Sequence, residues 1–245
     1  MTSPRSRLLP LCLCLLAALS ACSALRPEER PGVAAAEEAL RNGSPALAAQ
    51  IAKGILARNP DDVAGLLMQG DAETQLGQFT EATASFQHAL RQSPNAMRAK
   101  LGLGRLRLAS DAVEAAALFE DATKQEPRNV AAWSNLGIAR DLQGQHQSAQ
   151  DAYRQARIVD PGNIPAQVNL ALSLAMGGNS AEALKLIAPL AAQPSATPKL
   201  RHDYAAVLAM AGREAEATQI LRRDLSQPEV QQILEAIRNR RTSAF

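Results

Sequence analysis

Residues 130–161 read VAAWSNLGIARDLQGQHQSAQDAYRQARIVDP, which is a pattern of two short helices joined by a turn. Apolar and small side chains recur at three- and four-residue intervals on both sides of Gly144, and this is the spacing of one helix face. A glycine between two such segments favours a turn. Pro161 favours an end to the second helix because proline has no backbone N–H to donate. The stretch therefore predicts a helical hairpin.

The same pattern recurs along the chain with a period of 33 or 34 residues. Prolines, glycines and aromatic rings form three ladders that share this period, which indicates internal repeats. The composition agrees, because a chain that is 47% hydrophobic but only 3% aromatic favours close packing of Ala- and Leu-rich helices. The ladders are Pro60, Pro94, Pro127 and Pro161; Gly70, Gly104 and Gly137; and Phe86, Phe119 and Tyr153.

Eight residues of the quoted stretch resemble the tetratricopeptide repeat in order and spacing. One position departs from that pattern, because Arg140 stands where an aromatic residue is common. The resemblance implies antiparallel helix pairs in which small residues allow close approach and the ring fills the space toward the next unit. Each hairpin buries its apolar face only against its neighbours, so a stack of units is needed for stability. The eight residues are Trp133, Leu136, Gly137, Gly144, Ala149, Tyr153, Ala156 and Pro161.

The repeats predict an all-α superhelical solenoid, a tetratricopeptide stack of about five to six helical hairpins with a C-terminal helix over 228–241. This solenoid domain is expected to occupy residues 33–245. The first unit has no ring, the third has lost one residue in its turn, and Pro189 is expected to bend the second helix of the fifth unit. The hairpins are expected near 33–60, 63–94, 97–127, 130–161, 164–195 and 198–224.

The N-terminus has the pattern of a secretory signal peptide over residues 1–21. Two arginines precede a 14-residue stretch without charge, which is shorter than the roughly 20 apolar residues that span a bilayer. The sequence LSAC at 19–22 resembles the bacterial lipobox, which implies cleavage before Cys22 and acylation of its thiol. Residues 22–32 would then be the lipidated N-terminus and a tether. The alternative is a plain signal peptide without lipid.

The lipobox resemblance also carries expectations about location and thiol chemistry. Because Ser23 rather than Asp follows the cysteine, the usual sorting rule implies the periplasmic face of the outer membrane of a Gram-negative bacterium. Cys12 and Cys14 would leave with the signal peptide, and Cys22 would carry lipid. We therefore expect no disulfide, no thiol catalysis and no cysteine-bound metal in the processed chain.

The sequence offers no pattern typical of nucleic-acid binding, catalysis or metal binding. Loss of two arginines with the signal peptide would leave 24 basic and 24 acidic residues, with a basic cluster only at 238–241. The G-x-G at 102–104 lacks the third glycine of a dinucleotide loop. His88, His146 and His202 share no repeat position and lack helical spacing to another ligand. We predict a non-catalytic protein without cofactor or metal, and a lipid-anchored envelope enzyme is the remote alternative.

The tetratricopeptide resemblance places a candidate partner-binding groove on the first helices of the units. Asn135 and Asn169, 34 residues apart, are expected at the same level of this groove, with Ile138, Leu172 and Met176 adding apolar contact. In some members of the family, equivalent asparagines hydrogen-bond an extended peptide. The alternative is that Asn-Leu-Gly is simply common at this place in the repeat.

The C-terminal half carries a more specific resemblance. Residues 187–230 contain APLA at 188–191, ATPKLR at 196–201 and LRRDL at 221–225, and look like the C-terminal part of lipoproteins of the tight-adherence (Tad/Flp) pilus assembly system. This implies a pilotin-like or scaffold role, with a secretin segment or another pilus-assembly subunit as protein partner. The alternatives are a type IV pilus pilotin, a β-barrel assembly component or a protease adaptor. The sequence leaves the oligomeric state open.

Overall fold

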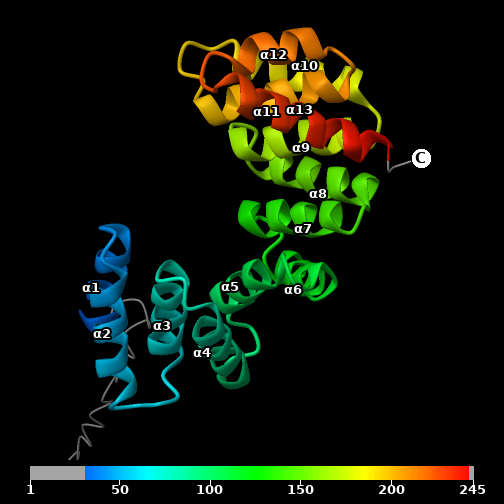
Figure 1. Ribbon diagram of the computed structural model, residues 1–245. Helices are drawn as coiled ribbons and strands as arrows, with labels where there is room; N and C mark the ends of the chain where they lie inside the picture. Colours follow the sequence, from blue (N-terminus) through cyan, green and yellow to red (C-terminus); the bar gives the residue numbers. More distant parts are fainter. Residues whose placement is uncertain (1–30, 243–245) are drawn as a thin grey trace, which may run out of the picture.

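The computed structural model describes residues 31–242, and within that range all the regular structure is helical (Figure 1). Twelve of its thirteen helices form six antiparallel hairpins, and the last lies at the C-terminus, which confirms the predicted all-α solenoid. Cys22, the signal segment 1–21 and the tether up to residue 30 lie outside the described residues. The helices are α1 (Pro31–Arg41), α2 (Pro45–Leu56), α3 (Val63–Gln75), α4 (Phe79–Gln92), α5 (Met97–Arg107), α6 (Ala112–Gln125), α7 (Val130–Leu142), α8 (His146–Val159), α9 (Ile164–Met176), α10 (Ser180–Ala191), α11 (Pro198–Met210), α12 (Glu214–Leu221) and α13 (Gln227–Thr242).

The hairpins stack along a curved path from α1 to α13 (Figure 1). The first helices α1, α3, α5, α7, α9 and α11 contact one another in succession, so they form the inner layer of the stack. Each second helix packs between its own first helix and the first helix of the next hairpin. Among the described helices, none is long and apolar enough to cross a membrane.

A glycine with positive φ forms the turn inside five of the six hairpins. Gly144, with φ of 73°, donates its N–H to the carbonyl of Asp141 at 2.9 Å, and Gln145 donates to Arg140 at 2.9 Å. These bonds satisfy the last carbonyls of α7 and reverse the chain, and a side chain at this φ would be strained. The other four are Gly43, Gly77, Gly178 and Gly212.

The third hairpin, in which one residue was expected to be missing, turns without such a glycine. Its first helix, α5, has 11 residues, whereas α3 and α7 each have 13. The turn is closed instead by Asp111, whose carboxylate accepts hydrogen bonds from the N–H groups of Val113 and Glu114 at 3.1 and 2.8 Å. An N-cap on the second helix therefore accompanies this turn, and the N–H groups of Ser110 and Asp111 satisfy the Arg107 carbonyl at the end of α5 without a glycine.

The core of the middle hairpins is an aromatic ring set against glycine. Phe86, Phe119 and Tyr153 are at most 2% exposed, and each ring lies against the helix backbone at a glycine. Phe86 is held between two glycines, one from its own hairpin and one from the next. This explains the G-x-G of α5 by helix packing. The ring and glycine pairs are Phe86 with Gly70 and Gly102, Phe119 with Gly104, and Tyr153 with Gly137.

The end hairpins replace the ring with smaller side chains. Ile187 and Leu221 occupy the ring position in the fifth and sixth hairpins and are buried. Pro189 lies inside α10, which continues to Ala191. Helix α13 covers the end of the stack by packing Val230 and Leu234 into the last core cluster.

Substitution of Gly104 by alanine tests the ring and glycine packing. A Cβ there would lie 2.5 Å from Cε1 and 2.6 Å from Cζ of Phe119, which is buried and cannot move away. Overpacking of this kind costs roughly 1–3 kcal/mol, more than the ~1 kcal/mol that alanine gains over glycine in a helix. We expect a lower melting temperature by circular dichroism. Gly54→Ala is the matched control, because nothing lies within 4 Å of its added Cβ; a fall of equal size there would contradict the interpretation.

Candidate functional site

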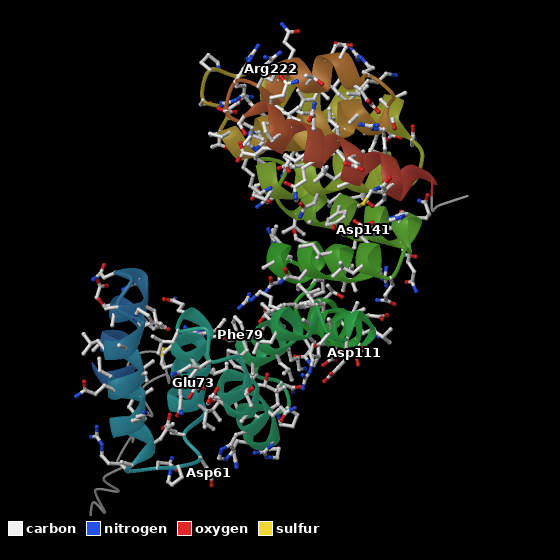
Figure 2. All side chains as sticks on the ribbon, in the orientation of Figure 1. Asp61, Glu73, Phe79, Asp111, Asp141 and Arg222 are labelled. Carbon is white, nitrogen blue, oxygen red and sulfur yellow. The ribbon has the colours of Figure 1, made fainter. Side chains whose placement is uncertain are left out.

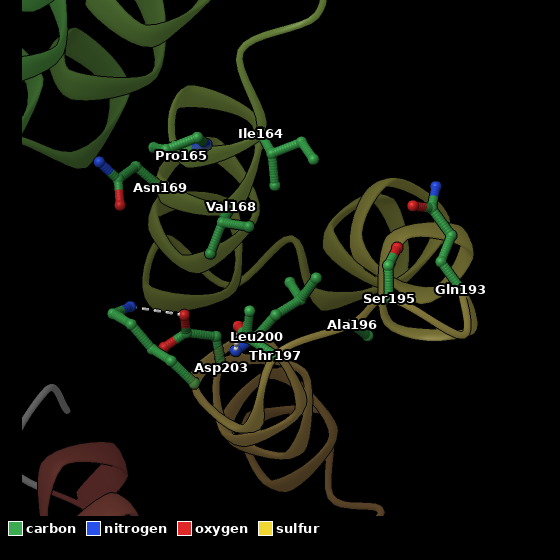
Figure 3. A pocket seen from close by; sticks show the side chains of 11 residues that line it. Ile164, Pro165, Val168, Asn169, Gln193, Ser195, Ala196, Thr197, Leu200 and Asp203 are labelled. Carbon is green, nitrogen blue, oxygen red and sulfur yellow. Dashed lines mark hydrogen bonds and ion pairs between the residues drawn. The ribbon is translucent and has the colours of Figure 1, made fainter.

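A pocket of about 350 Å³ lies on the inner layer between α9 and α11 (Figure 3). Three segments meet there: the first half of α9, the connection that follows α10, and the first two turns of α11. Its lining residues are Ile164, Pro165, Val168, Asn169, Gln193, Ser195, Ala196, Thr197, Lys199, Leu200 and Asp203.

The pocket has an apolar floor and a polar mouth. Val168, which is 5% exposed, and Leu200 point toward one another across the floor (Figure 3). At the mouth, Lys199 Nζ donates to Asp203 Oδ2 at 2.7 Å, and the amide of Asn169 lies on the facing helix. An apolar cavity with a few polar groups at its edge is the usual form of a site that takes a side chain or small ligand.

The connection between α10 and α11 creates this pocket. It contains six residues, 192–197, as does the connection at 57–62, whereas the connections at 93–96, 126–129 and 160–163 contain four. Its last residue, Thr197, caps α11 by accepting a hydrogen bond from Leu200 N–H at 3.2 Å, and Pro198 begins the helix. The extra length forms one wall of the pocket.

The structure brings only part of the predicted groove set to this pocket. Asn169 lines it, while Asn135 and Ile138 lie one hairpin away on α7. Ile138 and Leu172 are partly buried against a core cluster, and Met176 ends α9 with 38% exposure. The two asparagine amides have no hydrogen-bond partner among the described residues, so they remain available to a ligand. Binding by these five residues stays a prediction.

Sequence reasoning missed most of the pocket lining. Ile164, Val168 and Leu200 follow ordinary helical periodicity, which gives no sign that they face a hollow. The available signal was the six-residue connection over 192–197, which is longer than the four-residue connections of the three repeats before it. Length alone does not show whether a connection lies over the groove or away from it.

Asp141, labelled in Figure 2, joins the fourth and fifth hairpins through a partly buried hydrogen-bond cluster. Its carboxylate accepts from Ser173 Oγ at 2.7 Å, from His146 Nδ1 at 2.8 Å and from the Tyr153 hydroxyl at 3.1 Å. Burial, followed by the neighbouring carboxylate, raises the pKa of Tyr153 well above its usual range, so the hydroxyl stays protonated and donates. His146 is thus part of a structural cluster rather than an isolated surface histidine.

Arg98 links three successive first helices in the N-terminal half of the inner layer. Its guanidinium pairs with Glu37 of α1 at 2.8 Å and with Asp71 of α3. Burial raises the pKa of Asp71, and the Arg98 charge opposes that shift. These ion pairs tie the first helices of the N-terminal three hairpins to one another.

The histidines do not form a metal site in the described part of the chain. No group of three or more His, Cys, Asp or Glu side chains there has the arrangement to hold a metal ion. Each histidine contacts a single aspartate instead. The pairs are His88 with Asp61, His146 with Asp141, and His202 with Asp224.

The stacked hairpins and open inner layer define a helical-repeat protein that contacts other proteins. A model of the tetratricopeptide repeat matches residues 33–96, 67–117, 109–164 and 143–197, which together run without a gap from 33 to 197. The chain belongs to the tetratricopeptide repeat family. Proteins built from this repeat are typically non-catalytic scaffolds for protein–protein interaction.

Solved structures with the same fold cover most of the chain. PilW, a type IV pilus biogenesis factor, is 20% identical, covers 83% of this chain and 96% of its own, and has a TM-score of 0.73. A tetratricopeptide repeat protein from Parabacteroides merdae is 15% identical, with 84% and 82% coverage and a TM-score of 0.64. MamA from Desulfovibrio magneticus is 23% identical, with 65% and 90% coverage and a TM-score of 0.59. No curated protein matches the sequence.

Substitution of Asp141 by alanine tests its role between hairpins. The change leaves the buried Tyr153 hydroxyl without its acceptor and leaves Ser173 Oγ with only the more distant His146 carbonyl at 3.4 Å, and an unsatisfied buried hydroxyl costs about 1–3 kcal/mol. We expect a clear loss of stability in urea unfolding followed by circular dichroism. The matched control is Asp151→Ala, because this exposed aspartate pairs only with Arg154 and should change stability by less than about 0.5 kcal/mol. Equal effects of both substitutions would refute the role.

Proposed function

We propose that this protein is a lipid-anchored scaffold of the outer membrane that assists assembly of a Tad/Flp-type pilus or its secretin. The observation that carries the proposal is the run at 187–230, which resembles Tad/Flp assembly lipoproteins and lies in a tetratricopeptide solenoid that begins shortly after a lipobox. The fold supports a binding role because the solenoid presents an inner layer with a pocket and unpaired amides.

The similarity to PilW also supports a role in pilus assembly, because it extends over most of the solenoid. PilW is a type IV pilus biogenesis factor, and 83% of this chain aligns with 96% of it. A solenoid of matching length and curvature can present the same arrangement of first helices to a pilus-assembly partner. A type IV pilus role is therefore the second candidate. In both candidates the proposed partner machine is an envelope assembly that contains a secretin.

Acylation of Cys22 would give the scaffold its position. A single acyl chain binds membranes only marginally, so the two or three chains of a bacterial lipoprotein would make the anchor durable. From residue 22 to the start of α1 at residue 31, nine residues can reach about 30 Å. The solenoid would then stay close to the membrane, which raises its effective concentration toward a membrane-embedded partner.

Deletion of the gene tests the proposed role. We expect loss of surface pili and a fall in assembled secretin rings, because a pilotin-like scaffold acts before the ring is complete. Electron microscopy of cells and immunoblotting of unheated secretin multimers measure the two outcomes. A deletion strain with normal pili and normal rings would rule out the role.

Substitution of Cys22 by alanine tests the anchor separately. We expect the variant to lose incorporation of an alkyne-labelled fatty acid and to leave the outer-membrane fraction. Complementation of the deletion strain by this variant should be weaker than by the parent chain. Continued fatty-acid labelling of the variant would show that Cys22 is not the acylated residue.

The double substitution Asn135→Ala/Asn169→Ala tests the inner layer as the partner surface. Both amides lack partners among the described residues, so their removal should leave the fold intact and reduce recovery of the secretin in a pull-down from solubilised outer membranes. Asn95→Ala, at an exposed asparagine between α4 and α5, is the control. Full recovery of the secretin with the double variant would place its binding elsewhere. Recovery of partners unrelated to pili would leave only a scaffold role.

A further inference from the structure

The charged pair at the mouth of the pocket is strongly asymmetric in its exposure. The side chain of Lys199 is 81% exposed, whereas that of Asp203 is only 19% exposed. An ion pair with so exposed a lysine contributes about 0–1 kcal/mol, because holding the flexible side chain costs entropy and water screens the charge. Lys199 can therefore leave the pair at little cost, while the Asp203 carboxylate stays fixed at the pocket.

Arg201, the next cation of α11, is committed to a different carboxylate. Arg201 donates to Asp224 through Nε at 3.1 Å and through its terminal nitrogen at 2.6 Å, and His202 lies 3.3 Å from the same residue. Hydrogen bonds from Arg201 hold the pKa of Asp224 below its usual range, so this carboxylate keeps its charge. Lys199 is thus the cation left to neutralise Asp203.

The apolar floor of the pocket lies next to the Asp203 carboxylate. Leu200 and Asp203 are three residues apart on α11, which places such side chains about 5–6 Å apart on one helix face. In an extended segment, residues i and i+2 point to the same side and lie roughly 6.5–7 Å apart. An extended partner segment can therefore place one side chain over Val168 and Leu200 and the next but one beside Asp203.

We infer that the pocket between α9 and α11 binds an extended protein segment with an apolar residue and a basic residue two positions away from it. The apolar side chain enters the floor, and the basic side chain replaces Lys199 at Asp203. The Asn169 amide, on the facing helix, bonds the backbone of the segment and fixes its register. Charge complementarity selects the occupant, because the fixed charge of the pocket is negative and its own cation is the exchangeable partner. The inference rests on the proposed function in taking the inner layer as the partner surface.

Two defined peptides test this selectivity. The probes are acetyl-Ser-Leu-Ser-Arg-Ser-amide and the same peptide with Glu in place of Arg, whose blocked ends exclude terminal charges. Each is titrated against the full chain in detergent by saturation-transfer difference NMR, which detects weak binding. We expect the arginine peptide to bind about fivefold more tightly than the glutamate peptide.

Three variants separate the roles of the two charges. Lys199→Met should tighten binding of the arginine peptide, because it removes the competing cation, and Asp203→Asn should abolish the preference for arginine. Lys185→Met, at an exposed lysine on the outer helix α10, should change neither. Lys199 is so exposed that its substitution leaves the fold intact.

The opposite pattern would overturn the inference. If the glutamate peptide binds better and Lys199→Met weakens it, the pocket recognises an anion through Lys199. If the two peptides bind equally, Asp203 does not select a cation. Either result concerns only the pocket, because pilus and secretin assembly in the deletion strain test the proposed function independently.

Discussion

The close approach of an aromatic ring to a glycine in the neighbouring helix is the contact on which the middle of the solenoid depends. Phe86, Phe119 and Tyr153 are buried against helix backbone, and a Cβ at the facing glycine would overlap each ring. The contact sets how closely the two helices of a hairpin approach, and Phe86 extends it to the next hairpin through Gly102. Each hairpin covers its apolar face only with its neighbours, so the distance between the helices of one hairpin determines where the next hairpin packs. These distances together set the positions of the first helices.

Polar clusters then distinguish the two halves of the inner layer. In the N-terminal half, Arg98 ties α5 to α1 and α3, so charged side chains there are already paired. Asp141 holds the fourth and fifth hairpins together through Ser173, His146 and Tyr153. Beyond this junction, the longer connection between α10 and α11 opens a pocket instead of closing the surface. The repeat pattern supplies the scaffold, and the departures from it supply the surface that a partner can recognise.

These features suit a chain whose N-terminal end would be anchored and whose C-terminal half would bind the partner. A lipidated Cys22 would place the N-terminal hairpins near the membrane. The pocket lies between α9 and α11, toward the other end of the stack from α1 (Figure 1). A partner embedded in the membrane could then be engaged at a distance from the bilayer, where the proposed contacts with Asp203 and Asn169 decide which segment binds.

The sequence by itself determined the class of fold, the approximate hairpin boundaries and the loss of one residue within the third hairpin. These follow from local rules, because proline ends helices, glycine permits positive φ and the 34-residue ladders align side chains that must pack together. It also led to Asn169 as a groove residue, through its register in the repeat. Only the tertiary structure decided that Val168 and Leu200 face a pocket, that Asp141 joins two hairpins and that Arg98 spans three. Those contacts join side chains of different hairpins, and these side chains have no distinctive spacing in the sequence. Which of them meet depends on how the hairpins stack into the superhelix.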